Sequence, residues 1–216
     1  MSTDAKTSLH AVIFTGGMCQ SEFLAADDLH GDLVIAADAG WLLAQKCGVR
    51  PDIIVGDFDS SPVPVTDEET EILRVPVEKD DTDTTLACNI AIERGAREIL
   101  LIGGTGGRLD HTLSNVFLLE RLHRRGIRLT LTDGTNRARI LENESVSLPK
   151  AQFTYFSLLS LGASVISLAG CKYPLENAPL TRTDLYAVSN EITSASAAIT
   201  VAGDPVLLIE SDAHSL

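Results

Sequence analysis

Apolar runs alternate with amphipathic stretches over the first part of the chain, and this pattern predicts strands separated by helices. The expected strands are short apolar runs that end near turn residues: residues 11–15, 33–37, 53–55, 73–77, 98–102 and 128–132. The expected helices have apolar residues at helical spacing: residues 41–47, 82–94 and 111–125. Strands separated in this way are typical of a largely parallel sheet with helices layered on it.

The pattern changes after residues 133–136, which read Asp-Gly-Thr-Asn. Short β-rich runs then follow one another with turn residues between them: residues 138–141, 145–148, 153–159, 165–168, 197–201 and 206–210. Such a series is typical of a small antiparallel β-sandwich. We therefore expect an α/β fold, with an N-terminal layered, mostly parallel α/β domain in residues 1–135 and a small C-terminal antiparallel β-sandwich in residues 136–216.

Composition and charge narrow the classes of function. The chain has 216 residues, is 44% hydrophobic and 22% charged, and can therefore bury a core. A net charge of −13 disfavours nucleic acid and anionic membrane as partners. No apolar run approaches the ~20 residues needed to span a bilayer. The four cysteines have no metal-binding spacing, which favours buried free thiols and a cytoplasmic location.

Two acidic segments that follow predicted strands are the strongest chemical signal. Asp57 and Asp59 alternate with Phe58, so in extended backbone both carboxylates share one face. Residues 79–83, Lys-Asp-Asp-Thr-Asp, form the second segment. Like charges ~4 Å apart cost on the order of 4 kcal/mol at an effective dielectric of about 20, so this cluster needs a cation. Oxygen ligands alone favour Mg²⁺ shared with phosphate oxygens, which indicates phosphoryl or pyrophosphoryl transfer.

Several of these polar residues also have a purely structural explanation. Asp81 or Thr82 can cap the helix that begins near residue 82, and Asp83 then lies in its first turn, where the helix dipole favours negative charge. Lys79 is either a phosphate ligand or a solvated lysine. Capping explains one aspartate of the second segment but not three.

A glycine-rich segment, residues 103–107, follows another predicted strand. Backbone N–H groups in such a turn can approach an anion closely. The segment matches neither a Walker A loop nor the dinucleotide-binding fingerprint. Arg108 offers a planar fork for phosphate oxygens. Asp110 and His111 follow it, and the alternative for Asp110 is a helix N-cap, while His111 can be an ordinary residue at a helix start.

Two further residues are expected near the crevice at the carboxyl ends of the strands. Asp38 follows the predicted strand at residues 33–37, and its alternative role is a cap for the helix at Trp41. Asn115 either lines the crevice or packs inside the fold. Because ligands of α/β folds bind at the carboxyl ends of the strands, we expect these segments to meet there.

Together these segments resemble the thiamine pyrophosphokinase (thiamine diphosphokinase) family. The resemblance covers nearly the whole chain and rests on the order and spacing of five segments: residues 38–40, 56–60, 79–83, 103–111 and 189–191. Members of this family convert thiamine and ATP into thiamine diphosphate and AMP with Mg²⁺. The resemblance implies an ATP- and Mg-binding catalytic domain in residues 1–135, a thiamine-binding β-sandwich in residues 136–216, and a homodimer whose subunits share the active site.

The resemblance also implies roles for single residues. The metal-holding carboxylates are Asp57, Asp59 and Asp83. The residues around ATP are Asp38, Lys79, Asp80, Arg108, Asp110 and His111. The catalytic set is Asp57, Asp59, Asp83, Arg108 and Asp110. Ser189 and Asn190 are the implied thiamine contacts. Some relatives carry a tryptophan near the C-terminus that stacks on thiamine, whereas residues 204–208 here contain no aromatic and Tyr173 and Tyr186 are the last aromatics of the chain.

Two other functions compete with this interpretation. A haloacid-dehalogenase-like phosphatase would use Asp57 as its nucleophile. Its D-x-D motif normally belongs to the first strand of the domain, whereas here two predicted strands precede the strand at residues 53–55 that leads into the motif. A non-catalytic nucleotide-binding module would explain the crevice and the glycines but not so dense an acidic cluster.

Overall fold

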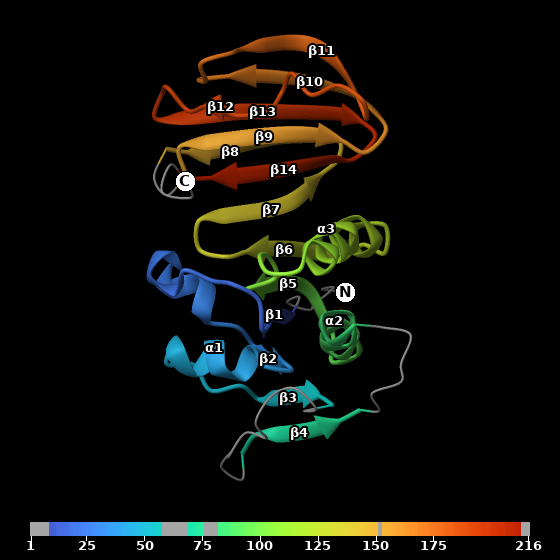
Figure 1. The fold of residues 1–216 in the computed structure, drawn as a ribbon. Helices are drawn as coiled ribbons and strands as arrows, with labels where there is room; N and C mark the ends of the chain where they lie inside the picture. Colours follow the sequence, from blue (N-terminus) through green and yellow to red (C-terminus); the bar gives the residue numbers. More distant parts are fainter. Residues whose placement is uncertain (1–8, 58–68, 76–81, 151–152, 213–216) are drawn as a thin grey trace, which may run out of the picture. The chain divides into compact units, whose positions relative to one another are not determined.

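The computed structural model describes residues 9–57, 69–75, 82–150 and 153–212 (Figure 1). The chain divides into two compact units, Met1–Gly134 and Thr135–Leu216, called unit 1 and unit 2 below. No helix in the described ranges is long and apolar enough to cross a membrane.

Unit 1 contains a parallel sheet. Its described strands are β1 (Leu9–Phe14), β2 (Leu33–Ala37), β3 (Ile53–Gly56), β4 (Glu71–Arg74), β5 (Ala96–Ile102) and β6 (Arg128–Thr132). Their spatial order is β6-β5-β1-β2-β3-β4, and the strand pairs recorded between them are parallel. The chain therefore runs outward from β1 to β4 and returns to add β5 on the other side of β1. This reversal is the topological switch point at which open α/β sheets bind ligands.

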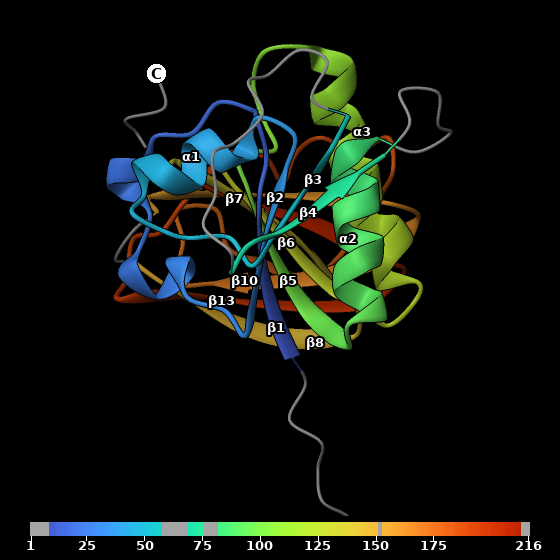
Figure 2. The same cartoon turned by 90° about the horizontal axis from the view of Figure 1, so that it is seen from below.

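Helices cover both faces of this sheet. The described helices are α1 (Gly40–Lys46), α2 (Asp83–Glu93) and α3 (Leu109–His123), with two short 3-10 helices, η1 (Ser21–Phe23) and η2 (Ala26–Leu29). Figure 2 shows α2 and α3 on one face of the sheet and α1 on the other. Successive strand residues are consequently buried on opposite faces, and Val12 and Ile13 are both inaccessible to solvent.

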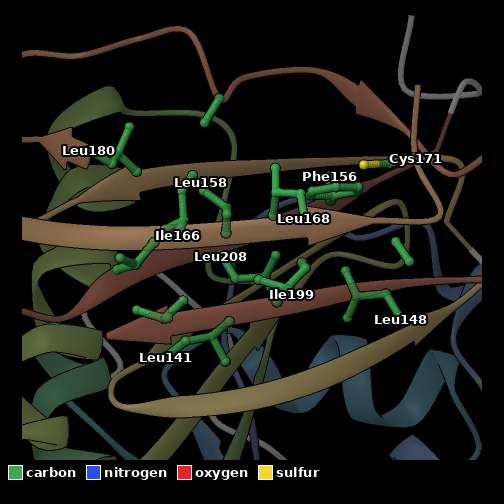
Figure 3. Packing of buried hydrophobic residues seen from close by; sticks show 14 of the residues in the cluster. Leu141, Leu148, Phe156, Leu158, Ile166, Leu168, Cys171, Leu180, Ile199 and Leu208 are labelled. Carbon is green, nitrogen blue, oxygen red and sulfur yellow. The ribbon is translucent and has the colours of Figure 1, made fainter. Parts of the chain in front are cut away.

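Unit 2 is built from antiparallel strands. They are β7 (Asn136–Leu141), β8 (Glu144–Pro149), β9 (Tyr155–Ser160), β10 (Ala163–Ala169), β11 (Leu175–Thr181), β12 (Asn190–Glu191), β13 (Ser196–Gly203) and β14 (Val206–Ser211). They pair in the orders β12-β9-β14-β7 and β11-β10-β13-β8. Leu158 and Leu208 from the first set pack with Ile166 and Ile199 from the second in one apolar core (Figure 3).

The mixed α/β class predicted from the sequence is confirmed, while some element bounds differ. β2 and β6 coincide with the predicted ranges, but β4 begins at Glu71, which pairs with Ile53, rather than at residue 73. β11 was not predicted, because Leu175–Thr181 contains Pro179 and lacks regular apolar alternation. It lies at the edge of its sheet, where a strand tolerates proline and exposure.

The four cysteines are free in the structure. Cys88 and Cys171 are buried as expected, whereas Cys19 and Cys47 are only partly buried.

Candidate active site

The carboxyl ends of β1, β2, β3 and β5 border a cleft of about 510 Å³ within unit 1. Its lining residues come from the segments that follow these strands and from the starts of α2 and α3: residues 15–18, 37–39, 57, 82–84, 103–108, 111 and 115. The cleft therefore lies at the switch point between β1 and β5, where the segments singled out in the sequence were expected to meet.

The loops that follow β1 and β5 touch through their backbones. A Cβ atom at Gly17 would overlap with the carbonyl oxygen of Gly103, so only glycine permits this approach. The N–H of Met18 donates to the carbonyl of Thr105 over 3.0 Å. The hydroxyl of Thr105 donates to Oδ2 of Asp133 over 2.6 Å, which ties the β5 loop to the segment after β6. These contacts fix the glycine-rich wall of the cleft.

The side chain of Asn115 holds the same glycine-rich wall through a hydrogen bond. It is buried in α3, and its Nδ2 donates to the carbonyl of Gly104 over 2.8 Å. Asn115 also lines the cleft, so both roles considered for it from the sequence apply.

Among the described residues, three carboxylates line the cleft: Asp38, Asp57 and Asp83. Asp38 has φ 46°, in the left-handed region, and its N–H donates to the carbonyl of Val55 over 2.8 Å, which connects the ends of β2 and β3. Aspartate tolerates this conformation better than most residues. The alternative that Asp38 caps the following helix is wrong, because α1 begins at Gly40 with Ala39 at its N-cap.

Asp83 is the first residue of α2, and Thr82 is the N-cap. Oγ1 of Thr82 accepts the N–H of Thr85 over 3.2 Å, so the threonine satisfies the helix terminus. The carboxylate of Asp83 is not needed for that cap. It lies in the first turn, where the helix dipole stabilises a negative charge.

Arg108 and Asp110 form a bidentate ion pair on the rim of the cleft. Nε and Nη2 of Arg108 donate to Oδ1 and Oδ2 of Asp110 over 3.1 and 2.6 Å. Asp110 is not among the cleft-lining residues, whereas Arg108 is. The alternative that Asp110 is an N-cap is wrong, because α3 begins at Leu109 with Arg108 at the N-cap.

The hydrogen bond from Arg108, together with one from the N–H of His111, lowers the pKa of Asp110 below its ordinary value. A carboxyl with a lowered pKa loses its charge only as the pH falls through that value, so the pair persists at neutral pH. The same hydrogen bond raises the pKa of Arg108. Because both side chains are exposed, the pair contributes little to folding, and its main effect is to orient the guanidinium.

The remaining predicted residues are placed differently. His111 lines the cleft. Asp59, Lys79 and Asp80 lie outside the described residues. Within the described ranges no group of three His, Cys, Asp or Glu side chains is arranged to hold a metal ion, and only Asp57 and Asp83 of the predicted metal ligands fall in those ranges.

Ser189 and Asn190 belong to unit 2. Ser189 is exposed, has φ 56°, and its N–H donates to Oγ of Ser157 over 3.0 Å. Asn190 is buried, and its side chain bonds to the backbone of Tyr173. The sequence did not indicate this contact, because the two residues are separated by a turn and a strand.

A glycine-rich wall and carboxylates at a switch point are typical of α/β proteins that bind nucleotides or other phosphate compounds. Comparison with known proteins agrees. A model of the thiamin pyrophosphokinase catalytic domain matches residues 29–131, and a model of the thiamin pyrophosphokinase vitamin B1 binding domain matches residues 144–206.

Individual relatives cover most of the chain. Thiamine pyrophosphokinase of Bacillus subtilis (strain 168) is 29% identical over 190 residues, which are 83% of this chain and 87% of that protein. The crystal structure of thiamine pyrophosphokinase from Bacillus subtilis superposes with a TM-score of 0.79 at 25% identity, covering 94% of this chain and 99% of that one. The thiamin pyrophosphokinase from Geobacillus thermodenitrificans gives a TM-score of 0.78 at 28% identity, covering 96% and 100%.

The chain therefore belongs to the thiamin pyrophosphokinase family. The family resemblance drawn from the sequence is confirmed, and so is the prediction that the protein is an enzyme.

The contact between Gly17 and Gly103 can be tested by Gly17→Ala. The added methyl group must push the β1 and β5 loops apart, so we expect kcat/KM for ATP to fall by about a hundredfold. Gly48→Ala is the control: Gly48 has φ 71° and open space around it, so a methyl group there costs about 1 kcal/mol of stability without touching the cleft. Steady-state kinetics and thermal melting separate the two effects. Unchanged kcat/KM for Gly17→Ala would contradict the importance of this contact.

Proposed function

We propose that this protein transfers the pyrophosphoryl group of ATP to the hydroxyl of thiamine and releases thiamine diphosphate and AMP. The observation that carries the proposal is the convergence of three carboxylates and a glycine-rich wall on one cleft, in a chain of this family. The match of the second family model, a vitamin B1 binding domain, to residues 144–206 supports thiamine as the acceptor.

The chemistry requires little more from the protein than position and charge. The hydroxyl of thiamine attacks the β-phosphorus of ATP, and the bond to the leaving AMP breaks. Backbone N–H groups of the glycine-rich wall and the guanidinium of Arg108 hold the phosphates in line for this displacement. Lys79 adds a second positive charge in this proposal. Holding both reactants in one orientation supplies much of the rate enhancement.

The carboxylates of the cleft fit a hard cation. Asp57 and Asp83 present only oxygen donors, which suit Mg²⁺, and Asp59 is the third ligand in our proposal. When bound there, Mg²⁺ would neutralise charge on the phosphate oxygens. Asp38 and His111 line the cleft, and we propose that both contact the nucleotide. The proposal gives Asp80 the same role.

The proton of the attacking hydroxyl needs an acceptor, and Asp83 suits this role better than Asp110. Asp83 lines the cleft. Asp110 is engaged with Arg108, and its lowered pKa makes it a poor base. We therefore assign the orientation of Arg108 to Asp110, and the acceptance of the proton to Asp83, through the carboxylate oxygen that does not hold the cation.

The two competing functions find less support. In the fold, Asp57 follows the third strand of the unit and not the first, unlike the nucleophile of a haloacid-dehalogenase-like phosphatase. A function as a non-catalytic nucleotide-binding module does not explain why carboxylates line the cleft. We also propose that the enzyme works in the cytoplasm, where its free cysteines stay reduced.

The three functions differ in what they release from ATP. We expect AMP to appear only when thiamine is present, together with an equal amount of thiamine diphosphate, measured by chromatography. Phosphate release without thiamine, or a phosphorylated Asp57, would favour the phosphatase. Nucleotide binding with no release of AMP or phosphate would favour the binding module.

The role of the cleft carboxylates can be tested by Asp83→Asn. Asparagine keeps the shape but not the charge, so we expect kcat to fall by a factor of 100 to 1,000, which is roughly 3–4 kcal/mol of transition-state stabilisation. Glu93→Gln is the matched control, because it removes an exposed carboxylate at the other end of α2. Equal activity of the two variants in the AMP assay would show that Asp83 is not part of the catalytic centre.

We further propose that the active site is shared in a homodimer, with the nucleotide residues of one subunit and Ser189 and Asn190 of the other. The motivation is the family resemblance, together with the location of the two residue sets in different units. A two-fold interface is isologous, so it would create two equivalent shared sites.

Sharing can be tested by mixing two impaired variants, Asp83→Asn and Asn190→Ala, after dissociation and reassociation. Each mixed dimer would regain one intact site, so at low thiamine concentration the activity should exceed the mean of the two parents. Native mass spectrometry establishes that mixed dimers have formed. Activity equal to that mean, with mixed dimers present, would show that each site is built within one chain.

A further inference from the structure

The side chain of Asn190 is occupied inside unit 2. The residue is 3% exposed. Its Nδ2 donates to the carbonyl of Tyr173 over 2.9 Å and to Sγ of Cys171 over 3.4 Å. Its Oδ1 accepts the N–H of Tyr173 over 3.0 Å. Asn190 therefore holds both backbone polar groups of Tyr173.

This bonding limits what Asn190 can offer a ligand. An asparagine amide has two N–H donors, and both are used within the protein. A ligand that took either donor would break the hydrogen bond to the carbonyl of Tyr173 or the one to Sγ of Cys171. The geometry thus favours a role in holding Tyr173 over direct hydrogen bonding to a substrate.

The ring that Asn190 holds in place faces solvent. Tyr173 is 60% exposed although its backbone is fixed at both N–H and carbonyl. The neighbouring segment adds a backbone hydrogen bond of 2.9 Å from the N–H of Lys172 to the carbonyl of Glu191. An exposed aromatic ring on an ordered backbone offers a large contact area at a low cost in conformational entropy.

The ring already faces a positive charge. Nζ of Lys172 lies 5.8 Å from the centre of the Tyr173 ring, within the range of a cation–π contact. The same ammonium lies 3.5 Å from Oε2 of Glu191. Lys172 can therefore leave the ring and keep a carboxylate partner. The exposed face of Tyr173 is thus suited to a flat cationic ligand that replaces the lysine.

We propose that Tyr173 supplies the aromatic surface that contacts the positively charged ring of thiamine, and that Asn190 is the positioning residue that holds it. This inference rests on the proposed function, which makes a thiazolium cation the acceptor substrate. Aromatic faces attract cations that lack a proton to donate, and the thiazolium ring is such a cation. Tyr186 is a weaker candidate, because its hydroxyl already donates to the carbonyl of Pro179.

The aromatic contact can be tested with three variants of the full-length enzyme. Tyr173→Leu should raise both the KM for thiamine and the Kd for thiamine from titration calorimetry by about tenfold, with the KM for ATP unchanged. Tyr173→Phe keeps the ring and should stay within about twofold of the wild type. Tyr186→Leu is the matched control and should leave all three constants unchanged.

Unchanged constants for Tyr173→Leu, or an equal loss for Tyr186→Leu, would overturn the assignment of the ring to Tyr173. The result remains distinct from a failure of the proposed function, which would appear as a wild-type enzyme without thiamine-dependent AMP release.

The positioning role of Asn190 requires a double-mutant cycle. If Asn190 acts only through Tyr173, Asn190→Ala should raise the Kd for thiamine in the wild-type background and change it by less than about twofold in the Tyr173→Leu background. If Asn190→Ala instead raised the Kd for thiamine by the same factor in both backgrounds, Asn190 would contact thiamine directly, and its positioning role would be overturned. Circular dichroism of each variant checks that the effects do not come from unfolding.

Discussion

The close approach of Gly17 to Gly103 is the constraint on which the site in unit 1 depends. A side chain at Gly17 would overlap with the Gly103 carbonyl, and without that contact the hydrogen bond from Met18 to Thr105 could not form. The two loops that meet there follow neighbouring strands on either side of the switch point. Their contact turns two separate strand ends into one wall of backbone groups, and the wall defines where an anion can lie.

This wall matters because the protein as a whole is strongly acidic. With a net charge of −13 and three carboxylates in the cleft, long-range attraction cannot bring a polyanion to the site. The attraction for a polyanion must come from local groups, namely the backbone N–H groups of the wall and Arg108. In the proposed mechanism, a cation held by the carboxylates adds to this attraction. The bidentate pair with Asp110 keeps the guanidinium oriented on the rim, and a phosphate must compete for it. Binding of free nucleotide should then be weak, which agrees with the proposed binding of nucleotide together with a metal ion.

The sequence predicted the strands of unit 1 well because strands buried on both faces are continuous apolar runs, as at Val12 and Ile13. It also predicted that the carboxylates after these strands meet, since parallel strands present all their carboxyl ends at one edge of the sheet. It missed features that depend on partners remote in sequence. The start of α3 is one case: Arg108 occupies the N-cap without a side-chain hydrogen bond. The residue at the cap therefore gave no capping signal, while Asp110, a residue type that favours N-caps, lies inside the helix. The edge strand β11 is another, because exposure removes the alternation on which strand prediction relies.

Asn190 shows the same limit at the level of a single side chain. A polar pair such as Ser189-Asn190 in a turn resembles two equivalent ligand contacts when only the sequence is considered. In the fold the residues differ, because Ser189 is exposed while Asn190 is buried against Tyr173, seventeen positions earlier in the chain. The distinction arises from the bridge between Cys171 and Ile192, which brings the two segments side by side. A residue can therefore be required for binding because it fixes the backbone of another, and the hydrogen bonds of its own amide show which of the two roles it has.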